Sequence, residues 1–138
     1  MDDALRRLAE TTARRHALER VSMGLAGKVL RRTVSKVDGG VSGVISTSQK
    51  KFGLFLFADG TYRMEVTRFT SVSSGGYGVP SEEKSSDEGQ WSVEMMEDRP
   101  ALVLRQRGTL AQWWHVEDGG DGVEYLNGAR WDRYKIRP

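Results

Sequence analysis

The sequence predicts a mainly β protein, an antiparallel up-and-down barrel of about eight strands that follows an N-terminal α-helix. Two turn signals support this, Asp59-Gly60 and Asn127-Gly128, and each lies between runs of β-branched, aromatic and aliphatic residues. Such dipeptides between β-rich runs are typical of tight hairpins. Short strands recur at regular spacing, and nearly all their connections read as hairpins. A meander of this kind has no free edges when it closes on itself, which favours a barrel.

The amino-acid composition excludes several kinds of functional site. The 138 residues include no cysteine and two histidines, so the sequence excludes disulfides, thiolate metal sites and cysteine nucleophiles, and we expect no metal and no cofactor. Neither an apolar run of membrane-spanning length nor a signal-peptide core is present, so we expect a cytoplasmic protein that does not associate with a membrane.

A basic helix is predicted at the N-terminus, over residues 2–21. Residues 1–36 contain nine Lys/Arg and four Asp/Glu, whereas residues 37–138 contain twelve and fifteen. Leu5 and Leu8 begin a thin apolar stripe at helical spacing. Such a helix needs a packing surface, on its own barrel or on another molecule, because helices gain most of their stability from packing. We divide the chain into a helix (1–23) and a barrel (24–138), and expect the arginines to contact a protein partner or a second copy: Arg6, Arg7, Arg14 and Arg15.

The central hairpin, residues 52–67, is predicted to turn through a two-residue type I′ turn at Asp59-Gly60. In that register Phe57 pairs with Tyr62, and Phe55 and Phe57 point into the barrel. Residues 38–51 read as a loop with a short β run. Residues 68–89, rich in serine and glycine, read as a long mobile loop or a flexible hairpin arm. The strands are predicted at 28–37, 52–58, 61–67, 90–96, 101–107, 109–116, 123–126 and 129–136.

Side chains with polar tips on the predicted inner face suggest a ligand pocket, since pockets combine apolar walls with a few convergent polar groups. A filled core with hydrogen-bonded polar groups is the alternative for the same residues. The expected lining is Tyr62, Met64, Trp91, Gln106, Trp113 and His115.

The outer face is predicted to carry an apolar patch of Leu54, Leu56 and Trp114. Exposed apolar patches are usually covered, so either the N-terminal helix docks there or a partner does. Nucleic acid is not an expected partner, because residues 37–138 are net acidic.

Five segments, LAGKVLRR, LFADGTYRMEV, GQWSVE, LVLRQRG and YLNGARW, together resemble small bacterial lipocalin-like (calycin-like) domains over about residues 24–136. The resemblance implies a small antiparallel barrel, an apolar ligand cavity and no catalysis.

We therefore expect a non-enzymatic binding module that acts by protein–protein contact or by holding a small apolar ligand. The alternative is a small barrel enzyme acting on a hydrophobic molecule. In that case His115 is the acid or base, and Tyr62 or Gln106 orients the substrate. Whether the barrel interior is filled or open separates these functions.

Overall fold

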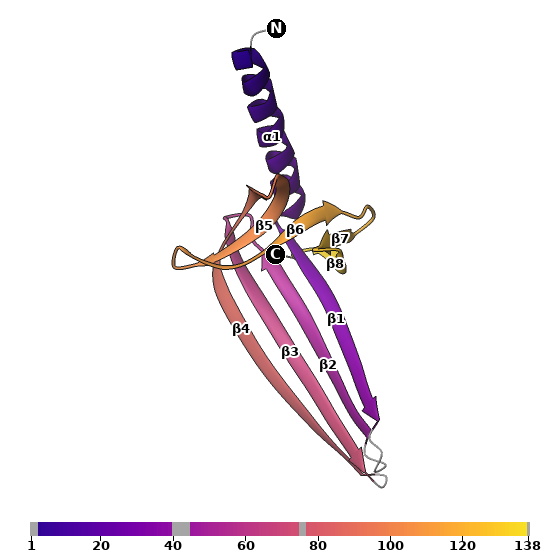
Figure 1. Cartoon of the computed structure of the whole chain (residues 1–138). Coiled ribbons are helices and arrows are strands. Elements are labelled where there is room, and N and C mark those ends of the chain that lie inside the picture. Colours follow the sequence, from indigo (N-terminus) through magenta and orange to yellow (C-terminus); the bar gives the residue numbers. More distant parts are fainter. Residues whose placement is uncertain (1–2, 40–44, 75–76, 138) are drawn as a thin grey trace.

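A computed structural model describes residues 3–39, 45–74 and 77–137 of the chain (Figure 1). Each of the eight antiparallel strands pairs with the next along the chain, and the eighth pairs with the first. The predicted fold class, a closed up-and-down barrel with an N-terminal helix, is confirmed. The elements are α1 (Asp3–Leu25), β1 (Lys28–Gly39), β2 (Ile45–Leu56), β3 (Thr61–Ser74), β4 (Tyr77–Met96), β5 (Arg99–Gln106), β6 (Thr109–Asp118), β7 (Val123–Leu126) and β8 (Ala129–Lys135).

Helix α1 stands out from one end of the barrel, and only its last turns are packed (Figure 1). It is four residues longer at its C-terminal end than the predicted helix, because Gly24 continues the helix. The helix stops after Leu25, where Gly27 adopts a φ of +74°, a conformation that glycine tolerates best. Leu25 is fully buried and Val21 packs against the same core, so the C-terminal end of α1 covers one end of the barrel.

Closure of the barrel is limited to its helix end. β8 pairs with β1 only over Lys28–Arg31, and β5 pairs with β4 only from Gln90 onward. Beyond these points β1–β4 continue together as a four-stranded extension, which we call the arm (Figure 1). None of the arm's described side chains is buried. The arm consists of residues 32–39, 45–52, 66–74 and 77–85.

The loop predicted for residues 38–51 is largely wrong, and of the two alternatives for residues 68–89 the structure has the hairpin arm and not the loop, because most of these residues belong to the arm's strands. β2 begins at Ile45, β3 continues to Ser74 and β4 begins at Tyr77, while residues 40–44 and 75–76 lie outside the described residues. The mostly polar composition suggested loops, since a strand facing a core carries apolar residues on one face. Here adjacent strands pair their backbones, and both faces of the sheet accept polar side chains because, among the arm's described residues, only Phe52 packs against the core.

The type I′ turn predicted at Asp59-Gly60 is also wrong. The loop has three residues, 58–60, and of these only Gly60 has a positive φ, +89°. The Asp59 carboxylate accepts hydrogen bonds from the Thr61 amide (2.9 Å) and the Thr61 hydroxyl (2.6 Å), which fixes the longer loop. Tyr62 therefore pairs with Leu56 instead of Phe57. A shift of one residue exchanges the two faces of a strand, so β2 points Leu54 and Leu56 inward, together with Phe52, and points Phe55 outward.

A second register error affects β6. The pairing of β5 with β6 shifts between Leu104 and Arg105, where Ala111 is the extra residue of a bulge. Beyond the bulge Trp114 lies opposite Leu102, on the inner face, and Trp113 and His115 lie on the outer face. By contrast, the type I′ turn predicted at Asn127-Gly128 is confirmed, with φ values of 50° and 80°.

One hydrophobic cluster occupies the barrel interior. Aliphatic and aromatic side chains from β1–β8 and from the end of α1 form it, and Phe52, Met64, Val93 and Trp114 pack around it. Trp131 joins its two sides, since its ring lies 5.9 Å from that of Phe52 and 6.3 Å from that of Trp114. The buried members are Leu25, Leu30, Leu54, Leu56, Tyr62, Trp91, Leu102, Leu104, Val116, Leu126 and Trp131.

Candidate functional site

Four residues of the predicted interior pocket do lie inside the barrel, where other protein groups engage them. The Tyr62 hydroxyl accepts a hydrogen bond from Gln106 Nε2 (3.1 Å), and Trp91 Nε1 donates to the Phe57 carbonyl (2.8 Å). Tyr62 and Trp91 belong to the buried cluster, and Met64 packs against it. The polar tips on this face thus hydrogen-bond within the protein, as expected for a filled core.

The prediction that Trp113 and His115 line the same pocket is wrong, because the bulge at Ala111 turns them to the outer face. Their rings make an edge-to-face contact with centroids 5.0 Å apart. The His115 side chain is 13% exposed, and its Nε2 lies 3.6 Å from a carboxylate oxygen of Glu97. Its Nδ1 is buried without a hydrogen-bond partner. The sheet separates His115 from Tyr62 and Gln106, so the residues of the enzyme alternative do not converge.

The apolar outer patch predicted from Leu54, Leu56 and Trp114 does not exist. The two leucines are fully buried and Trp114 packs against the core. The cause is the pair of register changes described above, which reverse the faces of β2 and of the second half of β6. The expected docking of α1 on that patch is accordingly also wrong.

The N-terminal part of α1 instead presents its apolar stripe to solvent. Leu5 and Leu8 are 60% and 64% exposed. At ~100° per residue, Leu5 emerges about 160° around the helix from Val21 and Leu25, which hold α1 on the barrel. The stripe therefore points away from the docked face. The expected partner-binding arginines lie in this region, where Arg6 pairs with Asp3 (3.3 Å), Arg14 pairs with Asp98 (3.7 Å), and Arg7 and Arg15 are exposed.

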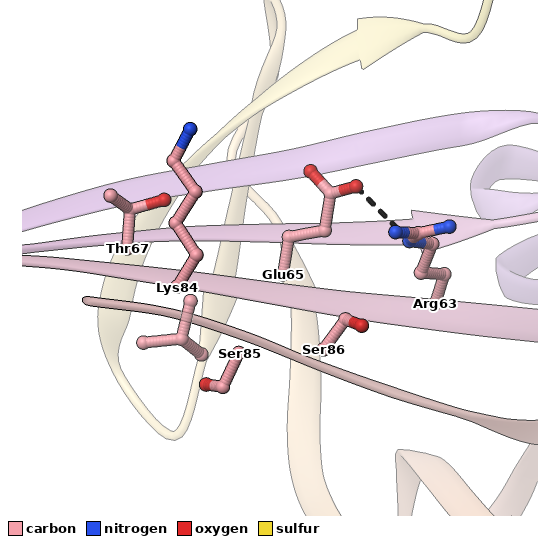
Figure 2. A pocket seen from close by; sticks show the side chains of 7 residues that line it. Arg63, Glu65, Thr67, Lys84, Ser85 and Ser86 are labelled. Carbon is pink, nitrogen blue, oxygen red and sulfur yellow. Dashed lines mark ion pairs between the residues drawn. The ribbon is translucent and has the colours of Figure 1, made fainter. Parts of the chain in front are cut away.

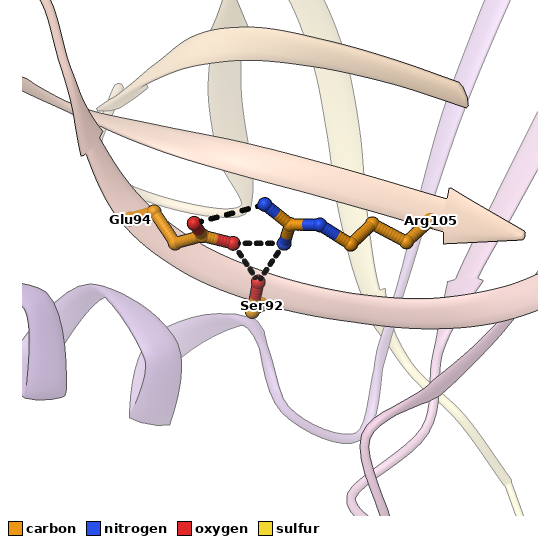
Figure 3. Close-up of polar contacts among 3 residues, drawn as sticks. All are labelled: Ser92, Glu94 and Arg105. Atoms are coloured by element: carbon orange, nitrogen blue, oxygen red, sulfur yellow. Dashed lines mark hydrogen bonds and ion pairs between the residues drawn. The ribbon is translucent and has the colours of Figure 1, made fainter. Parts of the chain in front are cut away.

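A polar cluster on the outer face of β4 and β5 joins Ser92, Glu94 and Arg105 (Figure 3). Arg105 Nη2 donates to Glu94 Oε1 (3.1 Å), Arg105 Nη1 donates to Glu94 Oε2, and the Ser92 hydroxyl donates to Oε2 (2.6 Å). The Arg105 guanidinium, and then the Ser92 hydroxyl, hold the pKa of Glu94 below its ordinary value. Every group here is paired with another, so the cluster links two strands and offers no free acid, base or nucleophile.

A second ion pair lies under α1. Glu124 is only 4% exposed and accepts a hydrogen bond from Arg133, whose Nη1 is also 3.7 Å from Asp118. Burial raises the pKa of Glu124, against the lowering effect of Arg133. A space of about 300 Å³ separates this pair from Arg20 and Val21 of α1. The carboxylate and the guanidinium of this pair satisfy each other, so the pair offers no free acid or base.

Where the arm begins, a hollow of about 320 Å³ lies over β3 and β4 (Figure 2). Its charges are balanced, because Arg63 Nε lies 3.0 Å from Glu65 Oε1 and Lys84 Nζ lies 3.3 Å from Glu82 Oε1. We call it the β3–β4 hollow, and its lining is Arg63, Glu65, Val66, Thr67, Lys84, Ser85 and Ser86.

A larger hollow, of about 640 Å³, lies where β1 separates from β8. We call it the β1–β8 hollow. Its lining combines four cations, one carboxylate and two aromatic rings. The full set is Arg31, Arg32, Thr33, Lys51, Phe52, Arg130, Asp132 and Tyr134.

Sequence reasoning missed the β1–β8 hollow, because its residues come from three strands that only the pairing of β1 with both β2 and β8 brings together. Two signals in the sequence point toward it, the basic pairs Arg31-Arg32 and Lys50-Lys51, but neither shows which strands are neighbours.

No group of three or more potential metal ligands gathers anywhere in the described ranges. Within them, no helix combines the length and the apolar character that crossing a membrane requires. Comparison of the chain with protein-family models, curated proteins and solved structures finds no significant match.

Proposed function

We propose that this chain is a non-enzymatic binding module, a lipocalin-like barrel that contacts a protein partner through the N-terminal part of α1. The strand order and the antiparallel closure support the likeness to lipocalins. The hydrophobic cluster inside the barrel favours contact with a protein over storage of a small apolar ligand, because the same side chains that would line a ligand cavity pack on one another.

The observation that carries the proposal is the exposure of the stripe begun by Leu5 and Leu8, on a helix half that has no packing surface of its own. An isolated helix of about 12–15 residues is marginal in water, so this half gains stability when another surface covers the stripe. Amphipathic helices bind in this way by laying an apolar stripe in a groove.

The chemistry of the partner follows from the charges beside the stripe. Residues 3–16 contain four arginines and two acidic residues. Arg7 and Arg15 are exposed, and no carboxylate of the described residues lies within ion-pair distance of either. A groove with an apolar floor and acidic rims complements such a helix, whereas a second copy of the same helix would bring like charges together.

Photo-crosslinking in an extract of the protein's own host tests the proposal. A benzophenone amino acid replaces Leu8 in one sample and Leu110, an exposed leucine of β6, in the control. We expect one discrete product from position 8 and none from position 110. Excess wild-type protein should compete the product away, excess Leu5→Ser protein should not, and mass spectrometry should identify an acidic protein.

Other results would overturn the proposal. Identical products from both positions, or equal competition by wild-type and Leu5→Ser protein, would show that the stripe does not select the partner. A product of twice the chain's mass would show that a second copy occupies the stripe, and absence of any product would leave the stripe without a partner.

A further inference from the structure

The end of the β1–β8 ladder creates a site that the proposed function does not use. The pairing stops at Arg31 and Asp132, after which β1 enters the arm and β8 does not follow. Thr33 is the first outward-facing residue of β1 beyond this point, and among the described residues no strand lies on that side of it. The β1–β8 hollow occupies the angle between the two strands.

Charge is the main property of the β1–β8 hollow. Its only carboxylate, Asp132, lies 3.4 Å from Arg130. Across the described ranges no carboxylate is within ion-pair distance of Arg31, Arg32 or Lys51. The cations that line this one hollow repel one another, and an anion that binds among them relieves the repulsion. We propose that the β1–β8 hollow binds the phosphate of a ligand that also carries a flat aromatic ring, as a nucleotide or a short single strand of nucleic acid does.

The net acidity of residues 37–138 does not oppose this proposal, because the charges are segregated across the sheet. Residues 28–37 of β1 contain four Lys/Arg and no Asp/Glu, and residues 47–56 of β2 contain two and none. Residues 80–96 of β4 contain five acidic residues and one lysine. A phosphate therefore meets a positive surface at β1 and β2, and the acidic strand β4 lies two strands from β2 and three from β1.

Tyr134 provides a surface on which the flat aromatic ring of the ligand stacks. Tyr134 lines the hollow and is 53% exposed, and Phe52 is half-buried in its wall. Bases stack on exposed aromatic side chains of this kind. Arginine adds a planar donor group that bonds phosphate through two N–H groups at once. The volume is within the range of about 300–1,000 Å³ found for small-ligand sites.

The β3–β4 hollow provides an internal comparison. Arg63 and Lys84 each have a carboxylate within 3.3 Å, so its cations are already neutralised. Removing these two cations changes the net charge of the protein as much as removing Arg31 and Arg32. The two double variants therefore separate binding in the β1–β8 hollow from general attraction to a basic protein.

Fluorescence polarisation with a fluorescein-labelled oligothymidylate, and calorimetry with ATP, test the site on the full chain. We expect Arg31→Gln/Arg32→Gln to weaken binding at least about tenfold. The same variant should reduce the slope of log K against log salt for the oligonucleotide by ~0.7 for each phosphate that the protein no longer neutralises. Tyr134→Ala should weaken binding about fivefold or more. Arg63→Gln/Lys84→Gln should stay within about twofold of wild type, and circular dichroism should show that each variant is folded.

The two probes distinguish the sources of the phosphate. Binding of the oligonucleotide but not ATP assigns the site to a strand, and binding of ATP at equal or higher affinity assigns it to a nucleotide. The proposal is wrong if neither probe binds, if both double variants weaken binding equally, or if Tyr134→Ala has no effect. Failure of the crosslinking experiment to find an α1 partner would leave these results unchanged, because α1 does not line the β1–β8 hollow.

Discussion

The inward orientation of Leu54 is the structural feature that a pair of substitutions tests most sharply. Leu54 is fully buried against Met64, whereas its neighbour Phe55 is half-buried on the other face. Replacing a fully buried leucine with alanine costs about 2–5 kcal/mol, because burial is lost and a cavity remains. Phe55 stacks on Phe57 with ring centroids 6.3 Å apart, and the Arg31 guanidinium lies 5.8 Å from its ring. Removing these two ring interactions costs about 1–2 kcal/mol.

Leu54→Ala should therefore lower the free energy of unfolding by ~1 kcal/mol more than Phe55→Ala, although phenylalanine is the larger side chain. The measurement is urea unfolding followed by tryptophan fluorescence, with circular dichroism as a second probe of two-state behaviour. In thermal unfolding the difference should be about 4 °C in Tm. A larger destabilisation by Phe55→Ala would mean that β2 has the opposite register, with a two-residue turn at its end.

Three further predictions use matched or pH-resolved comparisons of stability. Glu94→Gln should cost about 0.5 kcal/mol at neutral pH, where the exposed pair is intact. Because the folded pKa of Glu94 lies below its ordinary value of 4.5, this contribution is present above that pH and disappears as the pH falls through the folded pKa, which unfolding curves at pH 7 and pH 3 will reveal. Gly89→Ala should lower the free energy of unfolding by about 1–3 kcal/mol, since a Cβ there would lie 2.2 Å from a backbone oxygen. Gly24→Ala should instead stabilise α1 by about 0.5–1 kcal/mol, because the space around Gly24 is open. Differential scanning calorimetry of both variants checks these two signs. Trp114→Ala should lower the free energy of unfolding more than Trp113→Ala, by at least ~1 kcal/mol, and the reverse order in urea unfolding would contradict the bulge in β6.

Local turn chemistry predicts much of the fold but misses the two positions where register is set. The number of strands, the hairpin order and the Asn127-Gly128 turn follow from short-range signals. The Asp59 side chain selects a three-residue loop through its bonds to Thr61, and Asp-Gly alone does not distinguish that loop from a type I′ turn. The bulge at Ala111 has no local signal in the sequence. Each of these two features reverses which side chains of a strand segment point inward. For this reason several candidate residues lie on the opposite face of the sheet from the one predicted.

The candidate surfaces depend on contacts that the sequence does not encode locally. The apolar stripe of α1 is visible as a pattern, but its exposure depends on which face Val21 and Leu25 dock. The β1–β8 hollow requires residues from both ends of the barrel sequence, and its charge is masked by the acidic residues of β4 in the overall count. The sequence pattern predicts which residues share one face of a helix or strand. The pairing of strands and the docking of the helix decide whether that face points to the core or to solvent.

The most direct test of the account is hydrogen–deuterium exchange of the protein alone and in complex with the partner captured by α1. In the free protein, amides of residues 4–16 should exchange quickly, because the side chains of this half of the helix are exposed and only Arg14 forms an ion pair with the barrel, while β5 should exchange slowly. Addition of the partner should slow exchange in residues 4–16 and leave the barrel strands unchanged. If the partner instead slows exchange in β2, β5 or β6 and leaves α1 unchanged, the proposed role of α1 is wrong and the partner binds the barrel.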